Sequence, residues 1–367
     1  MIRVLHVIGS MDLGGAETFV MNLHRNINRA EIQFDYVVHT DAEMYYEKEI
    51  IQLGGRIFRA PAFKGLNLFQ YKKWWRVFLT EHPEYKIVHG HIGSLAAIYL
   101  GIANKMGRFT IAHSHATKGY LSVQEIIFRL MSYPTRYVAR FFFGCSIQAG
   151  IDRYGKGIAR STRFRVINNG IDAEKYRYSK DVRTQCRTEL GVGEKTIVCG
   201  HIGRFVPEKN HQKILKVFKE VHKINPDSVL LLFGAGPEKK TIENLANECG
   251  LLSCIRFMGL TNRVNYYLMG MDVFIFPSIF EGLGISLVEA QATGLSCITS
   301  TAIVDEADIG AGLLTKLPLD LSDKKWAESV VEKSNTKRAD TLQNVIDSGF
   351  DISSVATELE SFYKSHN

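Results

Sequence analysis

The feature that most constrains the fold is an alternation of apolar strand segments with amphipathic helix segments, which starts afresh near the middle of the chain. The first series opens with residues 2–8 (IRVLHVI), a nearly all-apolar segment typical of a strand buried on both faces. A glycine-rich turn follows, and then AETFVMNLHRNI places apolar residues at helical spacing. Such alternation predicts parallel sheets with helices on their faces.

Both halves of the chain continue this pattern. In the first half we predict strands at QFDYVV, YKIVHG, FTIAHS and FFFGC and helices around residues 66–80, 94–105 and 122–139. In the second half we predict strands at TIVCGHIG (196–203), SVLLLFG, IRFMG and DVFIFPS and helices from about 208 to 224, over PEKKTIENLANECG and over 352–365. Two such series predict an α/β protein with two Rossmann-like parallel-sheet domains.

The polar, turn-rich stretch NNGIDAEKYRYSK (168–180) lies between the two series and is the expected linker. We therefore expect an N-terminal domain over residues 1–175, a C-terminal domain over 176–350, and a C-terminal helix within 351–367. That last helix can pack on either domain, including back on the first. A length of 367 residues suits two domains.

Composition narrows the class of protein. The chain is 46% hydrophobic and 23% charged, which is ordinary for a globular protein. Its six cysteines form no CxxC pair, so reduced thiols are expected instead of a disulfide framework or a zinc site. The N-terminus lacks the features of a signal peptide, and no apolar run approaches the roughly 20 residues that span a bilayer. A cytoplasmic location is expected.

Charge is uneven along the chain. Residues 1–165 carry a balance of +10 and the remainder −3, within a net charge of +7. A basic first half predicts an anionic partner, and because no nucleic-acid motif accompanies it, a membrane surface or phosphorylated ligand is favoured over nucleic acid. YKKWWRVF (71–78) and FRLMSYPTRYVARFFF (128–143) interleave basic and aromatic residues, which suits either an anionic membrane surface or an ordinary amphipathic helix.

In each series, a candidate ligand-binding turn follows the first strand. In GSMDLGGAE, Gly14 and Gly15 would allow close backbone approach at a helix N-terminus that favours phosphate, although the sequence is not GxGxxG and a plain tight turn is the alternative. In GRFVPEKNH (203–211), Arg204 and Lys209 could converge on a diphosphate. The alternative for the second turn is a solvated basic loop.

The stretch FEGLGISLVEAQATGL (280–295) carries two glutamates at the start of an apolar helix. Glu281 is expected in the loop and Glu289 in the second helical turn. A carboxylate among apolar neighbours is costly unless it is paired, and the vicinal hydroxyls of a ribose or sugar could pair with Glu289. The alternatives are a backbone or lysine partner for Glu289 and a favourable helix N-terminal position for Glu281.

A histidine pair ends a strand of the first half in AHSHATKG (112–119). His113 and His115 share one strand face and could ligate a metal. We recognise no further cluster with metal-ligand spacing and no Asp-x-Asp pair, so no metal is expected. One histidine acting as a hydrogen-bond donor to a ligand is the preferred interpretation, and a histidine that only caps the strand end is the alternative.

Together these motifs resemble the retaining glycosyltransferases of family four, which have the GT-B fold. The resemblance covers nearly the whole chain and rests on GGAE (14–17), HSHATKG, NNGID (168–172), GRFVPEKNH, FGAGP (233–237) and E-x7-E (281–289). EAQATGLSCITS and DEADIG resemble the bacterial capsular and exopolysaccharide members. The resemblance implies two Rossmann-like domains that face an interdomain cleft. Gly284 is a departure, because proline or phenylalanine is often found there.

The resemblance also implies residue roles. Arg204 and Lys209 would hold the donor diphosphate, Glu289 the ribose hydroxyls, and Glu281 would lie near the donor sugar. His115 would contact that sugar, with His113 as the alternative in register. The remaining implied donor-binding residues are Gly14, Gly15, Gly203, Gly234, Phe257, Gly282, Leu283 and Gly284.

The implied reaction is transfer of a hexose or N-acetylhexosamine from a UDP-sugar to a glycan acceptor, lipid-linked at the cytoplasmic membrane face, in surface polysaccharide synthesis. It would proceed with retention, without a metal or other cofactor. Front-face attack is preferred over a covalent intermediate on Glu281. The alternatives are a GDP-mannose-dependent transferase, a nucleotide-sugar epimerase of the same fold, and a non-enzymatic sugar-nucleotide-binding regulator.

Overall fold

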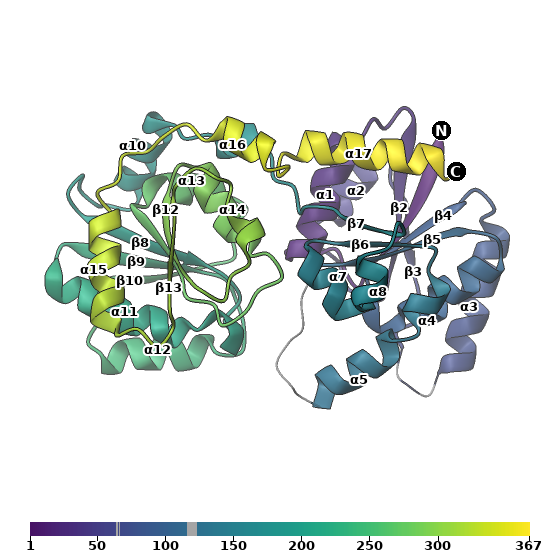
Figure 1. Cartoon of the computed structure of the whole chain (residues 1–367), viewed down its shortest axis with the longest axis horizontal. Coiled ribbons are helices and arrows are strands. Elements are labelled where there is room, and N and C mark those ends of the chain that lie inside the picture. Colours follow the sequence, from purple (N-terminus) through teal and green to yellow (C-terminus); the bar gives the residue numbers. More distant parts are fainter. Residues whose placement is uncertain (64, 66, 116–122) are drawn as a thin grey trace. The chain divides into compact units, whose positions relative to one another are not determined.

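A computed structural model describes residues 1–63, 65, 67–115 and 123–367, without the side chains of 124 and 125. The ATKG part of the histidine motif (116–119) lies outside the described residues, as do residues 66 and 122, which open two predicted helices. The chain forms two compact units (Figure 1). The N-terminal unit comprises Met1–Asp172 and Gly349–Asn367, and the C-terminal unit comprises Ala173–Ser348.

The N-terminal unit is built on a parallel seven-stranded sheet of order β3-β2-β1-β4-β5-β6-β7. Its strands are β1 (Ile2–Val7), β2 (Ile32–Val38), β3 (Ile57–Arg59), β4 (Ile87–Gly90), β5 (Phe109–Ser114), β6 (Phe141–Gly144) and β7 (Phe164–Val166). Its helices are α1 (Gly15–Asn26), α2 (Glu47–Gln52), α3 (Leu68–Glu81), α4 (Gly93–Lys105), α5 (Val123–Ser132), α6 (Thr135–Val138), α7 (Ile147–Tyr154), α8 (Lys156–Ala159) and α17 (Ile352–Ser365).

The C-terminal unit is built on a parallel six-stranded sheet of order β10-β9-β8-β11-β12-β13. Its strands are β8 (Ile197–Ile202), β9 (Ser228–Phe233), β10 (Ile255–Gly259), β11 (Val273–Phe276), β12 (Ser296–Ser300) and β13 (Leu314–Leu317). Its helices are α9 (Ala173–Tyr176), α10 (Lys180–Glu189), η1 (Pro207–Lys209), α11 (His211–Ile224), α12 (Lys239–Glu248), α13 (Val264–Gly270), α14 (Ile285–Ala292), η2 (Asp305–Ala307), α15 (Asp323–Lys333) and α16 (Leu342–Asp347).

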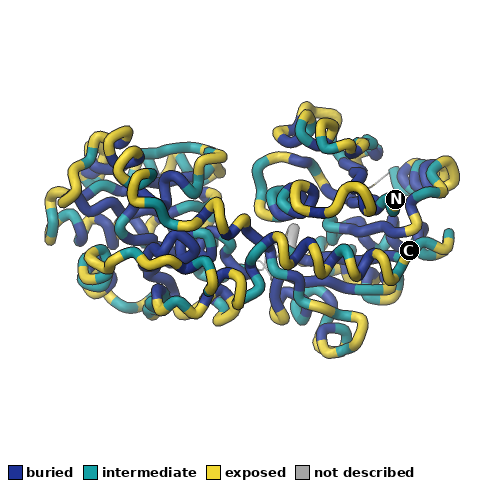
Figure 2. Tube along the Cα trace, turned by 90° about the horizontal axis from the view of Figure 1, so that it is seen from above, coloured by how far each residue is buried: buried dark blue, intermediate teal, exposed yellow. Residues whose placement is uncertain are grey.

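The first sheet has an apolar core on each of its faces, which explains why its strands are nearly all apolar. Val4 of β1 belongs to the core beneath α1 and α17, whereas Leu5 and Val7 belong to the core beneath α3 and α4. Alternate residues of a strand point to opposite faces, so a strand covered on both faces has no polar side. Figure 2 shows buried segments in the interior of each unit and exposed segments mainly on its outside.

The C-terminal helix α17 completes the core of the N-terminal unit. Its apolar side chains, among them Leu359, Phe362 and Tyr363, are buried in the same core as those of α1. The adjoining backbone pairs Ile171 with Asp351 in an isolated parallel bridge. The unit division falls between residues 172 and 173 and between 348 and 349, so the expected boundary at residue 175 lies inside α9.

One sequence prediction was wrong in the N-terminal unit, and one residue of a segment for which a membrane surface or an ordinary amphipathic helix was open lies in the core. The helix predicted over 122–139 is two helices, α5 and α6. Pro134 has no N–H to donate a helical hydrogen bond, and its ring would clash with the carbonyl group of the preceding turn. Trp75 was a candidate for a membrane surface, but it is fully buried beside Tyr71 and Tyr99 in the core under α3 and α4. Trp74 packs against that core from the partly buried flank of α3.

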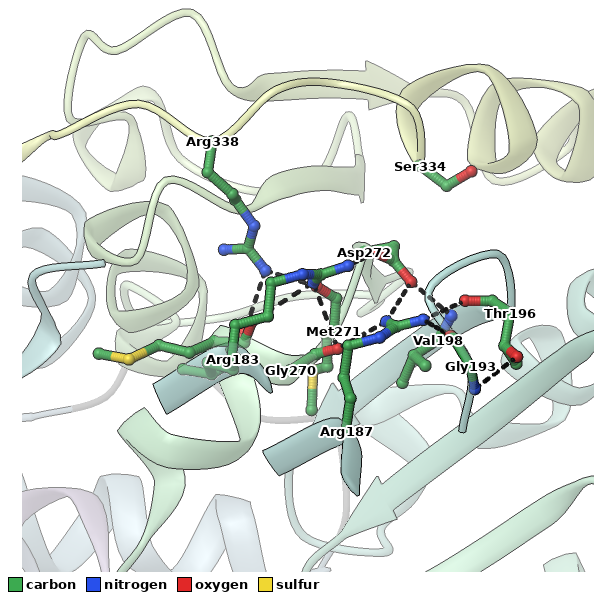
Figure 3. Close-up of polar contacts among 12 residues, drawn as sticks. Arg183, Arg187, Gly193, Thr196, Val198, Gly270, Met271, Asp272, Ser334 and Arg338 are labelled. Atoms are coloured by element: carbon green, nitrogen blue, oxygen red, sulfur yellow. Dashed lines mark hydrogen bonds and ion pairs between the residues drawn. The ribbon is translucent and has the colours of Figure 1, made fainter. Parts of the chain in front are cut away.

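A buried ion network fixes one end of the second sheet (Figure 3). The Asp272 carboxylate, just before β11, accepts hydrogen bonds from Arg183 at 2.6 Å, Arg187 at 3.0 Å and the Val198 N–H at 2.8 Å. Arg338 donates to backbone carbonyls there, and burial lowers the pKa of Arg338 to about 10. The network joins α10, β8 and β11 and is structural. Among the described residues, no helix combines the length and apolar character needed to cross a bilayer.

Candidate active site

The strand order of the C-terminal sheet reverses between β8 and β11, which makes this position a candidate ligand site. The chain runs outward from β8 through β9 to β10, then returns to begin again at β11 on the other side. In open parallel sheets, ligands bind at the carboxyl ends of the strands beside such a reversal. The GRFVPEKNH loop follows β8 and the FEGLG loop follows β11, so the two predicted motifs meet there.

Direct contacts join these two loops. The Ile279 N–H donates to the Glu208 carbonyl at 2.8 Å, and the Asn210 side-chain amide donates to the Pro277 carbonyl at 3.2 Å. Asn210 adopts a left-handed backbone conformation, with φ of 56°, as the chain passes from η1 into α11. Ser286, in the first turn of α14, donates to the Ile202 carbonyl at 3.0 Å. The strand ends and the start of α14 therefore form one connected structure.

Lys209 and Glu281 are brought together at this point. Their side chains form an ion pair and are 17% and 13% exposed. Lys209 Nζ also lies 5.0 Å from the centroid of the Phe276 ring, and its methylene groups pass over Gly203. A Cβ at Gly203 would lie 3.2 Å from Lys209 Cδ. The lysine is thus held in place by an apolar contact and by a carboxylate that an anionic ligand could displace.

Glycine is needed at two of the predicted donor-binding positions, for different structural reasons. Gly234 has φ of +136°, and a Cβ there would lie 2.1 Å from the Gly203 carbonyl oxygen, so close approach of two backbones requires it. Gly284 has φ of +83° and precedes α14, and a Cβ there would lie 3.1 Å from the Phe276 ring. Leu283 is buried and Gly282 is half-buried in the same loop. The backbone here is specified by packing, and it presents the N-terminus of α14 to the strand ends.

Glu289 lies farther along α14 and has a partner that sequence reasoning missed. The Tyr176 hydroxyl donates to its Oε1 at 2.5 Å. Burial raises the pKa of Glu289 to about 7, while the Tyr176 hydrogen bond and the charge of Lys175 act in the opposite direction. The carboxyl is therefore poised between its neutral and charged forms near neutral pH.

Two other predicted residues lie apart from this ion pair. Arg204 is exposed, and its guanidinium forms no ion pair with the described residues. Phe257 is on the edge strand β10, where it packs partly buried against the core, with its ring centroid 6.3 Å from that of Phe205. No hydrogen bond or ring contact within the described part of the chain joins either residue to Lys209 or Glu281.

The remaining predicted residues belong to the N-terminal unit. Gly14 caps α1, and a Cβ there would lie 2.2 Å from a Glu17 carboxylate oxygen, whereas a Cβ at Gly15 would meet no atom of the described residues within 4 Å. His115 Nδ1–H donates to Asn169 Oδ1 at 3.2 Å, and its Nε2 lies 2.8 Å from His91 Nδ1. Burial lowers the pKa of His115 to about 4, so the ring is neutral at neutral pH.

Comparison with known proteins decides the family. The model of "Glycosyltransferase Family 4" matches residues 13–175, and that of "Glycosyl transferases group 1" matches residues 182–305. EpsF of Bacillus subtilis (strain 168), named as a glycosyltransferase, is 32% identical over 348 residues, which is 92% of this chain and 88% of EpsF. The chain belongs to glycosyltransferase family four.

Further relatives agree with this glycosyltransferase assignment. CapH of Staphylococcus aureus, named as a capsular polysaccharide biosynthesis glycosyltransferase, is 23% identical over 381 residues, covering 100% of this chain and 99% of CapH. The crystal structure of Anabaena Alr3699/HepE in complex with UDP and glucose matches with a TM-score of 0.79 at 18% identity, covering 100% of both chains. The two parallel-sheet units of the glycosyltransferase are those of the GT-B fold.

Sequence reasoning also missed three histidines of the N-terminal unit. His6, His89 and His91 lie with His113 and His115 in one cluster, so the expectation that no further cluster with metal-ligand spacing accompanies the HSH pair was wrong. The signal was present in HGH (89–91), a second histidine pair at the end of a predicted strand. Its meaning depended on β4 and β5 being neighbours in the sheet, which the sequence alone does not give.

Proposed function

We propose that this glycosyltransferase transfers a hexose or N-acetylhexosamine from a UDP-sugar, with retention of configuration, to a glycan acceptor that is lipid-linked, in surface polysaccharide synthesis. The names of EpsF and CapH and the UDP and glucose bound by HepE support this choice. Relatives that match over part of the chain include a UDP-galactose transferase and GDP-mannose transferases, so a GDP-mannose donor is the second candidate.

The observation that carries the proposal is the Lys209–Glu281 pair between the ends of β8 and β11. A donor diphosphate would take the place of the Glu281 carboxylate as the partner of Lys209. The exposed Arg204 would add a second cation, and the N-terminus of α14 would add backbone N–H groups. Together these groups would stabilise the charge that develops on the departing phosphate without a metal bound to it.

The other proposed roles follow from this placement. Once freed from Lys209, Glu281 would lie near the donor sugar, and Gly282, Leu283 and Gly284 would present their N–H groups. Gly203 and Gly234 would shape the loop that meets the diphosphate. Glu289 would accept hydrogen bonds from the ribose hydroxyls, and Phe257 would border the base.

In the N-terminal unit we propose that His115 contacts the donor sugar and that Gly14 and Gly15 let the loop after β1 approach the donor. Gly15 is the better supported of the two glycines, because no atom of the described residues occupies the space of its missing side chain. His113 remains the alternative to His115, although it is almost wholly buried.

The proposed step is front-face displacement. The bond from the anomeric carbon to the phosphate oxygen breaks, and its electron pair goes to the phosphate. The acceptor hydroxyl oxygen bonds to the same face of that carbon, and its proton goes to the departing phosphate oxygen. Lys209 and Arg204 act on the leaving group, so their loss would reduce turnover more than donor binding.

The test is a screen for nucleotide released from a panel of UDP- and GDP-sugars, which needs no identified acceptor. We expect one UDP-sugar to be consumed, and we expect Lys209→Ala to abolish most of that release. The matched control is Lys216→Ala, which removes an exposed lysine from the next helix, α11. Release from GDP-mannose alone would favour the second candidate donor. No release from any donor, together with no thermal stabilisation by UDP or GDP, would exclude the proposal.

We also propose that the enzyme binds an anionic membrane surface from the cytoplasmic side through α5. Val123, Ile126, Ile127 and Leu130 follow the i, i+3, i+4, i+7 pattern of one helical face, yet they are 74%, 49%, 50% and 69% exposed. Tyr133 and Tyr137 extend the exposed apolar surface, and the N-terminal half carries the excess positive charge. This combination is typical of helices that lie in the membrane interface.

Co-sedimentation with vesicles tests this contact. Phosphatidylglycerol vesicles should retain the parent protein and lose the Ile126→Asp variant. Leu260→Asp, which changes an apolar residue 60% exposed in the C-terminal unit, should behave like the parent. Equal retention of both variants would rule out α5 as the membrane-binding element.

A further inference from the structure

Five histidines from neighbouring strands of the N-terminal unit form one cluster. His6 is on β1, His89 and His91 lie on and just after β4, and His113 and His115 lie on and just after β5. These strands are consecutive in the sheet, in the order β1-β4-β5. Residues two apart share a strand face, so the HGH and HSH pairs stack side by side. The ring centroids of His91 and His115 are 5.1 Å apart, and those of His113 and His115 are 4.1 Å apart.

The hydrogen bonds of the cluster run in two chains. One runs from Asn169 through His115 and His91 to His6, with N···N distances of 2.8 Å and 3.0 Å between the rings. The other runs from Tyr363 through His89 to His113. It joins the Tyr363 hydroxyl to His89 Nδ1 at 2.7 Å and His89 Nε2 to His113 Nδ1 at 3.1 Å. The second chain ends at His113 Nε2, which is buried and has no partner among the described residues.

His91, His113 and His115 each have one ring nitrogen engaged with an outer partner. These partners are His6 for His91 Nε2, His89 for His113 Nδ1 and Asn169 for His115 Nδ1. The opposite nitrogens of His91 and His115, Nδ1 and Nε2, contact one another, and His113 Nε2 has no hydrogen-bond partner in the part of the chain that the structure describes. One ligand nitrogen from each of the three residues lies within 4.8 Å of the other two. In metal sites, ligating histidines characteristically engage their second nitrogen with such an outer partner.

We propose that His91, His113 and His115 bind a divalent transition-metal ion of the Zn²⁺ type. Three imidazoles with no thiolate or carboxylate suit Zn²⁺ and leave a fourth tetrahedral position open. A tetrahedral ion with Zn–N bonds of about 2.0–2.1 Å holds its nitrogens roughly 3.3 Å apart. The 2.8 Å contact between His91 and His115 would open by about half an ångström.

The protonation pattern is compatible with binding. Metal binding needs a neutral ring whose inner nitrogen has a lone pair and whose proton is on the nitrogen that faces the outer partner, and the observed contacts allow this for all three histidines. With the ion on the inner nitrogens, His115 Nδ1–H donates to Asn169, and His91 Nε2–H donates to His6 Nδ1. His113 Nδ1–H donates to His89 Nε2, and His89 Nδ1–H then donates to the Tyr363 hydroxyl oxygen. Every hydrogen bond to an outer partner keeps one donor and one acceptor.

This site is distinct from the proposed diphosphate site, whose residues belong to the C-terminal unit. The two proposals meet only at His115. An ion on His115 Nε2 would occupy the nitrogen that otherwise could face a donor sugar, so metal loading should lower transferase activity if His115 contacts that sugar. The metal proposal is therefore tested by direct binding, which does not depend on activity.

The experiment uses the full-length chain without a histidine tag, stripped with a chelator and then dialysed against Zn²⁺ or Co²⁺. We expect one ion per chain by elemental analysis and the visible absorption of tetrahedral Co²⁺. His91→Asn and His113→Asn should each lose that ion, and His6→Asn, which removes an outer partner, should weaken binding about 10- to 100-fold. His366→Asn is the matched control, because His366 is in the same unit and outside the cluster.

The melting temperature is a second measurement, which keeps the proposal testable if a histidine variant folds poorly. Zn²⁺ should raise the melting temperature of the parent and of His366→Asn, because an ion bound only by the folded state stabilises it. The proposal is overturned if the parent retains no stoichiometric ion and shows no thermal shift, which would make the cluster a neutral hydrogen-bonded network only. It is also overturned if His366→Asn loses the ion to the same extent. Nucleotide release by chelator-treated enzyme is assayed separately, so a failure of the metal-site proposal can be distinguished from a failure of the proposed transferase activity.

Discussion

Replacing Glu289 by glutamine should make the protein more stable above neutral pH while weakening nucleotide binding. Glutamine has the same size and keeps an oxygen that can accept the Tyr176 hydrogen bond, which is 2.5 Å long in the structure. It removes only the charge. Burial raises the pKa of Glu289 from 4.5 to about 7, so the folded protein keeps a proton that the unfolded chain has already released.

The sign and size of the effect on stability follow from the linkage between proton binding and folding. A folded-state pKa above the unfolded value means that stability falls as the pH rises between the two values. At about 1.36 kcal/mol for each pH unit, the interval from 4.5 to about 7 corresponds to about 3 kcal/mol. Glu289→Gln should therefore match the parent at low pH and exceed its free energy of unfolding by up to about 3 kcal/mol above pH 7.

Urea unfolding of the C-terminal unit at about pH 5 and about pH 8 measures this difference. The control is Glu248→Gln, which changes an exposed glutamate and should alter stability by less than about 0.5 kcal/mol at both pH values. A Glu289→Gln difference that does not change with pH would refute the argument that the carboxyl is held neutral. Free UDP should bind the parent more tightly at the higher pH and should bind the variant weakly at both, because ribose hydroxyls favour the charged carboxylate.

The remaining predictions concern the ion pair, the buried network and a glycine. Lys209→Ala should reduce nucleotide release about 100- to 1,000-fold, and Arg204→Ala should act in the same direction, with initial rates as the measurement. Asp272→Ala should destabilise the C-terminal unit by about 3–5 kcal/mol because it leaves buried guanidinium groups unpaired, whereas Asp340→Ala, at an exposed ion pair, should cost less than about 1 kcal/mol. Gly234→Ala should lower the melting temperature and impair donor binding, because its Cβ would collide with a backbone carbonyl; an unchanged melting curve would contradict this.

Much of the fold follows from local pattern. The predicted strand FTIAHS is β5 and IRFMG is β10, because a buried parallel strand is a short apolar run between turns. The helix predicted over 352–365 is α17, but nothing in its own residues says that it packs on α1. Short, partly buried strands such as β7, FRV, carry too little pattern to be recognised.

The candidate site was only partly accessible from sequence. The lysine and two glutamates were recognised by type and position, but the pairing of Lys209 with Glu281 joins loops that are 72 residues apart. Tyr176, the partner of Glu289, is 113 residues away in the segment predicted to be a linker. Contacts of this kind depend on which strands become neighbours, and a single sequence specifies that only through the complete fold.

The return of α17 to the N-terminal unit has a consequence for how the chain is made. Synthesis proceeds from the first residue, so the ribosome releases Leu359, Phe362 and Tyr363 last of all the large apolar groups that this core needs. Until then, the surface of α1 that they cover remains open to solvent and to chaperones. A stop codon that removed only the final helix would therefore damage the half of the protein that was translated first.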